Sequence, residues 1–505
     1  MKHVEVRSGV YRDSVQLMQI SADLADQPQV RRALVAMATE LNLDLMAGMG
    51  FQVPAGTGHN DMLVALDTDD EATVVAALAR LDADLTGAGR DSATGADRPS
   101  GGIGTAAEPP RTIATATRGL AGPAVALVST PGRYAFVEAM DALGAGLSVM
   151  VFSDNVPVDQ EVRLKRFAAE SGLLVMGPDC GTAIVSGLGL GFANVVRPGP
   201  VGLVAASGTG AQQVLSLLAH AGVGVSHCLG VGGRDLSQTV GGLATRAALD
   251  ALDADPATEL IVLIAKPPAP EVAAQVAGHA AGLRTPVVFA ALGAGQPDLT
   301  TAVADVLTRS GRPVPTWPSW PASGSPNSTP MPTAEGGDLR GLFSGGTLCL
   351  EAMAVAAPVL GPIRSNIPLD PQWTAESGVA GHLMLDLGDD QYTVGRPHPM
   401  IDFGPRLEQI AAAADDPTCR VLLLDVVLGL AAHPDPASAL VPAIASALAG
   451  RTTPLSIVVA LIGTEDDPQG LVRQATALSG AGAHCHLSNA AAARQAAALA
   501  AGGAR

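Results

Sequence analysis

Two short segments place small residues and hydroxyl groups where an apolar strand is expected to give way to a helix. The first, Ser207-Gly208-Thr209-Gly210, follows the apolar run Val201–Ala206, and the second, Ser344-Gly345-Gly346-Thr347, follows Gly341–Phe343. Glycine lets a backbone approach a ligand closely, and the N–H groups and dipole of a helix start favour an anion. Ser and Thr are also ordinary helix caps beside tight turns, so anion binding and capping are alternatives at both segments.

Two other glycine-containing junctions are further candidates for the anion site. The segment Leu229–Asp235 is expected at a strand end, where ligands gather in parallel sheets. Its Gly232 and Gly233 leave room for a ligand, and the guanidinium of Arg234 can hold a carboxylate or phosphate with two N–H groups. The alternative is a surface loop in which Arg234 pairs weakly with the neighbouring aspartate. Gly429, which follows another apolar strand, completes the set of predicted anion contacts.

A proline-stiffened loop, Gly395–Asp402, carries Arg396 and His398, and His433 follows in a second loop of the same region. Arginine and histidine beside carboxylates suit general acid–base work or phosphate contact, so these three residues are the predicted catalytic groups. The alternative is that the loops only stiffen the chain and cap helices.

The turn Gly177–Thr182 ends the strand-and-helix segment that precedes the first glycine turn, and it contains Asp179 and Cys180. Together with Asn155 in an earlier polar loop, these residues are candidate contacts for CoA or substrate. A catalytic thiol at Cys180 is one alternative. No histidine lies nearby in the sequence, and we favour a buried, inert thiol.

Composition narrows the range of partners. The 505 residues carry a net charge of −18, so nucleic acid and anionic membrane surfaces are not expected as partners. Lysine occurs only at Lys2, Lys165 and Lys266, which leaves few positions for lysine chemistry. The five cysteines are far apart and form no C-x-x-C, so no disulfide framework and no metal site are predicted. The first residues lack a signal-peptide pattern and no apolar run could cross a bilayer, so we expect a cytoplasmic protein.

The chain is expected to be α/β throughout. Residues 1–86 form a small N-terminal α/β domain, predicted as a strand at His3–Val6, a long helix over Ser14–Leu41, a strand at Asp61–Leu66 and a helix at Glu71–Leu81, in the manner of a ferredoxin-like βαββαβ unit. Residues 87–111 read as a linker, and residues 112–197 as a Rossmann-like domain. A full G-x-G-x-x-G is absent from it, so nicotinamide binding is not predicted.

The remaining sequence contains the same folding unit twice, at residues 198–312 and 338–505, joined by a second linker at 313–337. Each copy has a glycine turn, then Asp255-Pro256 or Asp416-Pro417, then an apolar strand, then Thr285-Pro286 or Thr453-Pro454. Two matching halves with equivalent helix starts suggest one anion held between them.

The order of Gly177–Cys180, Val201–Gly210, Gly230–Asp235 and Thr285–Val288 resembles the α subunit of succinyl-CoA synthetase. The second copy, with Leu385–Gly388, resembles the carboxyl-terminal domain of that enzyme's β subunit. Fused in this order behind a small domain, the chain resembles the FdrA family. The resemblance implies a Rossmann-like CoA-binding-type domain followed by two flavodoxin-like domains of the synthetase type.

The chain departs from the synthetase at two catalytic positions. The stretch Gly293–Asp298 lacks the phosphorylated histidine, and Ala265-Lys266-Pro267 stands where the synthetase has a supporting glutamate. The FdrA resemblance implies a subunit of a multi-protein oxamate carbamoyltransferase, which converts oxalurate and phosphate into oxamate and carbamoyl phosphate. Phosphate or carbamoyl phosphate would then be the ligand, and partner subunits or a homo-oligomer would be expected. The alternatives are a CoA-binding acyl-CoA ligase and a non-catalytic assembly subunit.

Overall fold

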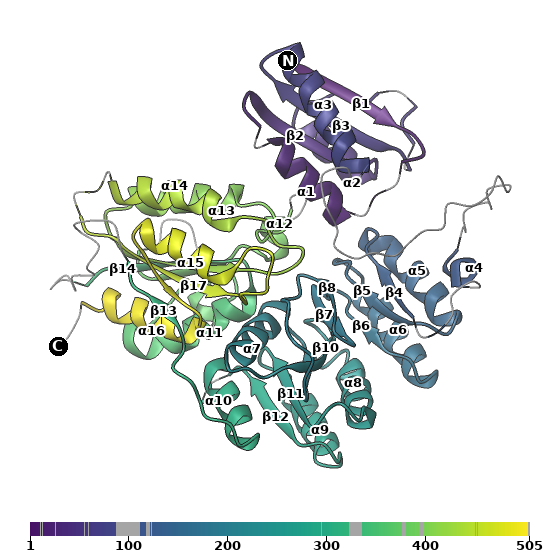
Figure 1. The fold of residues 1–505 in the computed structure, drawn as a ribbon, viewed down its shortest axis with the longest axis vertical. Helices are drawn as coiled ribbons and strands as arrows, with labels where there is room; N and C mark the ends of the chain where they lie inside the picture. Colours follow the sequence, from purple (N-terminus) through teal and green to yellow (C-terminus); the bar gives the residue numbers. More distant parts are fainter. Residues whose placement is uncertain are drawn as a thin grey trace. The chain divides into compact units, whose positions relative to one another are not determined.

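The computed structural model describes residues 1–502 except 11, 13, 26, 55, 59, 87–111, 118–121, 123, 294, 323–335, 376–379, 394–396, 450 and 452. The chain forms two compact units (Figure 1). The first unit comprises Met1–Gly122 with Gly395–Pro397, and the second comprises Pro123–Val394 with His398–Arg505. The predicted linker at 87–111 lies outside the described residues.

The first unit is built on a three-stranded antiparallel sheet in the order β1-β3-β2. Its elements are β1 (Lys2–Arg7), α1 (Ser14–Ala25), β2 (Val30–Met37), α2 (Glu40–Gly48), β3 (Met62–Thr68), α3 (Glu71–Thr86) and the short α4 (Ile113–Ala116). The central strand β3 is almost entirely buried. A fourth strand of a βαββαβ unit is not among the described residues.

The single helix predicted over Ser14–Leu41 is wrong. A turn at Pro28 and Gln29, where Gln29 adopts a φ of 71°, separates α1 from the strand β2. The apolar residues of this stretch suit a helix face and a strand equally, and pairing with β3 along Val30–Met37 decides in favour of the strand.

The second unit begins with a parallel three-stranded sheet in the order β4-β5-β6. Its elements are β4 (Val125–Val128), α5 (Gly132–Gly144), β5 (Ser148–Val151), α6 (Val158–Glu170) and β6 (Val175–Met176). Strands alternating with helices were predicted for this stretch, and the structure confirms them.

A six-stranded sheet follows, in the order β12-β11-β9-β10-β7-β8. Its strands are β7 (Thr182–Val185), β8 (Leu188–Gly191), β9 (Val201–Ala205), β10 (Val225–Gly230), β11 (Leu260–Ala265) and β12 (Val287–Ala291). Its helices are α7 (Gly208–His220), α8 (Leu243–Ala254), α9 (Pro270–Ala280) and α10 (Leu299–Arg309). Because β7 pairs with β10, the expected boundary at residue 197 passes through one sheet.

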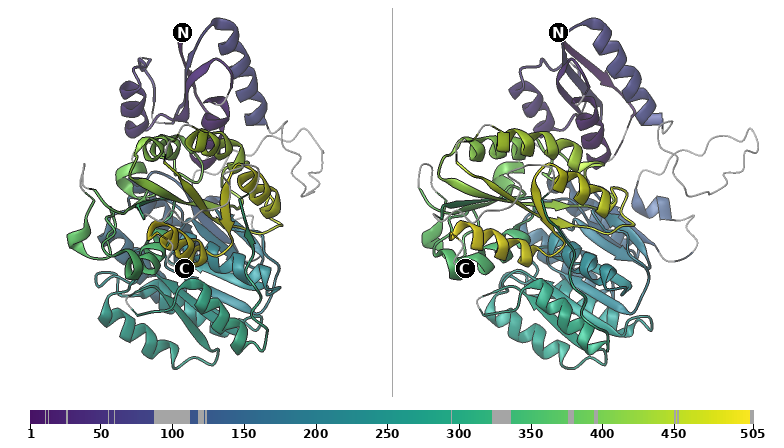
Figure 2. Two further views of the ribbon diagram at one scale, coloured as in Figure 1. Left: turned by 90° about the vertical axis from the view of Figure 1, so that its left-hand side faces the viewer. Right: turned by 60° about the vertical axis from the view of Figure 1, so that its left-hand side comes forward.

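The last sheet has the order β13-β18-β17-β16-β14-β15. Its strands are β13 (Ser319–Trp320), β14 (Asp338–Phe343), β15 (Leu383–Asp386), β16 (Cys419–Val427), β17 (Ser456–Ile462) and β18 (Ala483–His486). Its helices are α11 (Gly346–Leu360), α12 (Asp390–Thr393), α13 (Gly404–Asp415), α14 (Pro436–Ala449), α15 (Leu471–Gly480) and α16 (Asn489–Ala500), with a 3-10 turn at Pro371–Trp373. Figure 2 shows α13 and α14 on one face of this sheet and α16 on the other.

The two large sheets repeat one topology. Strands β10-β9-β11-β12 and β15-β14-β16-β17 stand in the same parallel order, which is the flavodoxin-like arrangement 2-1-3-4. The duplication predicted from the sequence is confirmed. The second linker is partly structured, because Trp320 in β13 pairs with β18 and packs on the core.

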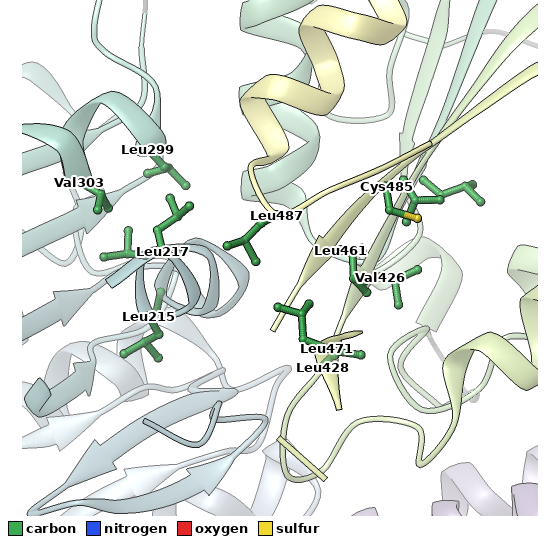
Figure 3. Packing of buried hydrophobic residues seen from close by; sticks show 14 of the residues in the cluster. Leu215, Leu217, Leu299, Val303, Val426, Leu428, Leu461, Leu471, Cys485 and Leu487 are labelled. Atoms are coloured by element: carbon green, nitrogen blue, oxygen red, sulfur yellow. The ribbon is translucent and has the colours of Figure 1, made fainter. Parts of the chain in front are cut away.

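We call each of the two repeats, together with its six-stranded sheet, a lobe. One hydrophobic cluster extends through both lobes. Leu215 and Leu217 of α7 belong to the same buried cluster as Leu428, Leu461 and Leu487 of the second lobe (Figure 3). The buried amide of Gln213 reinforces the contact, since it donates to the carbonyl of Leu487 at 3.1 Å and accepts from the N–H of Asn489 at 2.8 Å. This shared core fixes α7 relative to the second lobe.

Within the described residues, no helix has the length and apolar character that crossing a bilayer requires.

Candidate functional site

The two predicted helix starts meet in the structure. Ser207 precedes α7 and Thr347 lies in the first turn of α11, and the Ser207 Oγ donates a hydrogen bond of 2.6 Å to the Thr347 Oγ1. Ser207 also accepts from the N–H of Gly210 at 3.0 Å, so it caps α7 as the capping interpretation predicted. One hydroxyl therefore both caps its own helix and joins it to the equivalent helix of the other lobe.

The glycines of these turns permit the close approach. A Cβ atom added at Gly345 would lie 2.3 Å from the Oγ1 of Thr209, and one added at Gly210 would lie 3.0 Å from the Cγ2 of Thr347. Gly345 has an ordinary extended backbone, with φ −144°, so the requirement for glycine comes from the neighbouring lobe. The two helix N-termini, each the positive end of a helix dipole, are thus held against each other.

Ser344 serves as an anchor for the second turn. Its N–H and its Oγ both donate to the carboxylate of Asp425, at 2.8 and 2.9 Å. Asp425 is fully buried near the carboxyl end of β16 and forms an ion pair of 2.7 Å with Arg406, which is also buried. These contacts hold the turn in place, and they engage the hydrogen-bonding groups of Ser344.

Lys266 and Asp386 lie beside the start of α11. Lys266 follows β11 and Asp386 ends β15, so each stands at the carboxyl end of a parallel strand. A Cβ atom added at Gly346 would lie 2.5 Å from the Oδ2 of Asp386 and 2.9 Å from the Nζ of Lys266. Burial raises the pKa of Asp386 to about 7, although the charge of Lys266 opposes that rise.

Thr182 lies beside the start of α7, and Asp179 lies in the turn that precedes Thr182 in the sequence. The Oγ1 of Thr182, a residue 2% exposed, has no hydrogen-bond partner among the described residues and lies 3.5 Å from a Cβ atom added at Gly208. Desolvation and then the charge of Asp154 raise the pKa of Asp179, and Lys266 lowers it. Because the side chain of Asp179 is exposed, water weakens these shifts of its pKa. Its backbone is left-handed, with a φ of 58°.

Arg234 is engaged within the protein. Its guanidinium donates to the carbonyl of Val156 at 2.7 Å and lies 3.0 Å from the carboxylate of Glu161. The alternative of a surface pair with the next residue is wrong, because Asp235 is fully buried and pairs with Lys165 at 2.8 Å. No local pattern predicts these partners, because Val156 and, in α6, Glu161 lie far from Arg234 in the sequence.

The glycines of the same loop differ from each other. A Cβ atom at Gly232, which has a φ of 86°, would lie 2.5 Å from the carbonyl oxygen of Pro178, whereas nothing lies within 4 Å of one at Gly233. Gly429 lies elsewhere: its N–H donates to Gln469 at 3.2 Å, and a Cβ atom there would meet the carbonyl of Phe192 at 2.5 Å. Gly429 therefore packs at a contact between the lobes.

Of the predicted catalytic residues, Arg396 lies outside the described residues. His398 lies near the paired helix starts, since its Nε2 is 3.0 Å from a Cβ atom added at Gly388, and the carbonyl of Ser344 is 2.6 Å from the same point. Burial lowers the pKa of His398 to about 4, so the ring is neutral near pH 7. Its Nδ1 accepts from the N–H of Met400, which assigns the proton to Nε2.

His433 lies in a different place from His398. Its ring packs edge-on against Phe403, with the ring centroids 5.2 Å apart, and its Nδ1 accepts from the N–H of Asp435.

The Rossmann-like part brings its candidate residues together. Asn155 has a left-handed φ of 52°, and a Cβ atom at Gly132, the first residue of α5, would lie 2.7 Å from the carbonyl of Asn155. The N–H of Asp179 donates to the carbonyl of Ser153, which joins the two loops. Cys180 is 2% exposed, and burial raises the pKa of its thiol to about 12, which agrees with the inert alternative.

Comparison with known proteins finds two family models that each match a part of the chain. A family model described as "AllF, heavy metal-associated domain" matches residues 1–100, and one described as "CoA-ligase" matches residues 342–499. The chain is 35% identical over 502 residues to the uncharacterized protein YahF of Escherichia coli K12, covering 95% of each chain. This confirms the resemblance to the FdrA family.

More distant relatives match part of the chain. The α subunit of the ADP-forming succinate–CoA ligase of Methanothermobacter thermautotrophicus is 29% identical over 141 residues, which is 27% of this chain and 47% of that subunit. The chain thus matches about half the length of that subunit. Among solved structures, the chain resembles the dinucleotide-forming acetyl-coenzyme A synthetase 1 of Ca. Korarchaeum cryptofilum in complex with phosphate and ADP. The two are 18% identical, and the match covers 77% of this chain and 84% of that protein, with a TM-score of 0.28.

The first family's description raises the question of a metal ion in the N-terminal unit. Residues 1–100 contain no cysteine, whereas soft metal ions prefer thiolate ligands. Within the part of the chain that the structure describes, no group of three or more His, Cys, Asp or Glu could hold a metal ion. These residues do not fit a heavy-metal site, and we assign no step to one.

Lys266 and Asp386 were not among the predicted site residues. Lys266 is one of three lysines and directly follows an apolar strand of a parallel sheet, which is a signal that could have found it. Asp386 carries the same signal, because it ends the apolar run Leu383–Leu385. Their proximity depends on the packing of the two lobes, which the sequence does not reveal.

Proposed function

Because this chain belongs to the FdrA family, together with YahF, we propose that it is a subunit of a phosphate-dependent carbamoyltransferase of the oxamate type. The proposed reaction converts oxalurate and phosphate into oxamate and carbamoyl phosphate. The observation that carries the proposal is the hydrogen bond between Ser207 and Thr347, which joins the starts of α7 and α11. Two helix N-termini at one point, with a lysine beside them, favour a phosphate dianion.

The proposed chemistry is acyl transfer to phosphate. A phosphate oxygen attacks the carbamoyl carbon, the bond from that carbon to the amide nitrogen breaks, and the nitrogen takes a proton. Backbone N–H groups of the paired turns would hold phosphate and the negative charge that develops on the carbamoyl oxygen. His398, neutral with its Nε2 protonated, would act as a hydrogen-bond donor, and Arg396 and His433 stay proposed orienting groups.

This reaction needs no phosphohistidine. The segment after β12, Gly293–Asp298, has no histidine, and a lysine stands at the end of β11. A histidine cannot carry phosphate where none is present, whereas phosphate can attack a bound substrate directly. The sequence of the chain therefore supports direct transfer to phosphate.

An acyl-CoA ligase is the second candidate. The CoA-ligase family match at residues 342–499 and the loops near Asn155 and Asp179 support it to the same degree. It predicts CoA binding at those loops and nucleotide dependence, with a phosphate carrier other than a histidine after β12.

The test is to purify the chain with the proteins encoded beside it, add oxalurate and phosphate, and measure carbamoyl phosphate. A parallel reaction with nucleotide, CoA and a carboxylic acid measures thioester. Carbamoyl phosphate formed without CoA supports the proposal, and thioester without carbamoyl phosphate supports the ligase. If the complex remains fully active with Thr209→Val and His398→Gln variants, the chain is an assembly subunit.

A further inference from the structure

Lys266 is an unusual cation in this chain. Of the other two lysines, Lys165 is buried in ion pairs with Glu161 and Asp235, and Lys2 donates to the carbonyl of Gly50. Lys266 is partly buried, yet it donates no hydrogen bond and forms no ion pair to the described residues. Its charge acts on Asp386 and Asp179 without direct contact, so its N–H donors are available, and a partly buried ammonium group with unused donors favours an anion beside it.

Asp386 faces the same point from the other lobe. Its Oδ1 accepts from the N–H of Gly388 at 3.0 Å, while its Oδ2 and the Nζ of Lys266 both lie within 3 Å of the Cβ position of Gly346. Gly346 has no side chain to fill that position. That position is already crowded, so only a glycine lets the first turn of α11, the ammonium group of Lys266 and the carboxyl group of Asp386 come together.

A buried hydroxyl supplies independent evidence for a ligand. The Oγ1 of Thr182 lacks a partner among the described residues and lies beside Gly208, at the start of α7. The great majority of buried polar side-chain atoms have a partner, so an unpaired hydroxyl at this place indicates a group that binds there.

We propose that Lys266 binds the phosphate group at the paired helix starts, and that Asp386 donates the proton to the amide nitrogen that leaves an N-carbamoyl amide substrate. The inference rests on the proposed function. It specifies a substrate class in which a carbamoyl carbon is bonded to an amide nitrogen, because such a leaving group needs a proton whereas a thiolate or a phosphate does not.

The atoms balance as follows. A phosphate oxygen forms a bond to the carbamoyl carbon, and the electron pair of the broken carbon–nitrogen bond goes to the leaving nitrogen. That nitrogen receives the proton of the Asp386 carboxyl. The Asp386 carboxylate then regains a proton from the hydroxyl of the phosphate that has reacted, so Asp386 ends in its starting state.

The surroundings of Asp386 suit this role. Burial raises its pKa, and the bound phosphate adds a negative charge nearby that raises it further. The titratable groups that face it or act on it are Lys266, Asp389, Asp425, His398, Cys349 and Tyr392. Lys266 favours the carboxylate, so replacing Lys266 would leave Asp386 protonated to higher pH.

The test of Lys266 is phosphate binding to the full chain, measured by calorimetry with inorganic phosphate. We expect Lys266→Met to weaken binding by about 10- to 100-fold, the usual effect of losing a charge-assisted hydrogen bond, and Lys266→Arg to restore much of it. Lys2→Met is the matched control and should bind as the native chain does. Equal affinity in Lys266→Met, or no binding by the native chain at millimolar phosphate, overturns the inference.

The test of Asp386 is the pH profile of carbamoyl phosphate formation by the complex. The native rate should fall as pH rises through about 7, where Asp386 loses its proton. Asp386→Asn should lower kcat by about 100-fold or more, leave KM for phosphate within a few-fold and remove that alkaline limb. A retained limb in Asp386→Asn overturns its role. If the native complex makes no carbamoyl phosphate yet phosphate binding still depends on Lys266, the proposed function fails while the anion site stands.

Discussion

The contact between the two helix starts makes Gly345→Ala a sharp test of the fold at the site. The new methyl group would lie 2.3 Å from the Oγ1, 2.4 Å from the Cγ2 and 2.7 Å from the Cβ of Thr209. Thr209 belongs to the other lobe and is 9% exposed, so it has little room to move. The backbone of Gly345 is extended, so no conformational penalty adds to the clash.

Overpacking of this kind costs on the order of 1–3 kcal/mol, or roughly 2 °C of Tm per kcal/mol in a large domain. Thermal unfolding of the full chain, followed by circular dichroism, should show this loss. Gly233→Ala is the matched control, because nothing lies within 4 Å of its added Cβ atom, and its Tm should stay near the native value.

A double-mutant cycle shows where the clash comes from. Thr209→Gly removes all three clashing atoms, so it should recover at least about 0.5 kcal/mol of the loss when combined with Gly345→Ala. Strictly additive effects of the two substitutions would refute the contact between the helix starts, as would a Gly345→Ala chain with native Tm and native phosphate affinity.

Three further outcomes follow from buried groups. Lys165→Met should destabilise the chain by about 3–5 kcal/mol in denaturant unfolding, because it leaves Asp235 as a buried carboxylate without a cation, while Glu161 keeps only its ion pair with Arg234; a loss below 1 kcal/mol would contradict this. Burial raises the pKa of Glu351 in the folded chain from 4.5 to about 7, so its contribution to the free energy of unfolding falls by about 3 kcal/mol as pH rises from 4.5 to 7. Glu351→Gln should make the free energy of unfolding vary less with pH over that range. An unchanged dependence on pH would show that Glu351 is not its source. Cys180 should resist alkylation by iodoacetamide at pH 8 in the native chain, and rapid labelling of this thiol would show that it is neither buried nor inert.

Much of the fold followed from local patterns. The strands of the two repeats are apolar runs bounded by Gly and Pro, so the strands were predictable. The same Gly and Pro residues recur at equivalent places in both repeats, so the duplication was predictable as well. The stretch after Ser14 shows where this reasoning failed. Its apolar spacing suits a helix and a strand alike, and only pairing with β3 distinguishes them.

The part of the site that has a local sequence pattern was predictable, and the part that depends on packing was not. The glycine turns have a local signature, and their convergence follows from the equivalence of the two lobes. Arg234 has no such signature for its ion pair, because its partner Glu161 comes from α6, far away in sequence; its contact with an anion stays a prediction. Lys266 and Asp386 likewise come close to each other only because the two lobes pack together. No local pattern in a single sequence encodes contacts between segments that lie far apart along the chain.

The central claim is that the two helix starts hold one anion. The most direct measurement is a crystal structure of the chain soaked in phosphate. We expect one phosphate between the first turn of α7 and the first turn of α11, with the Nζ of Lys266 within hydrogen-bond distance. Helix starts that lie apart, or phosphate bound elsewhere with this position filled only by water, would contradict it.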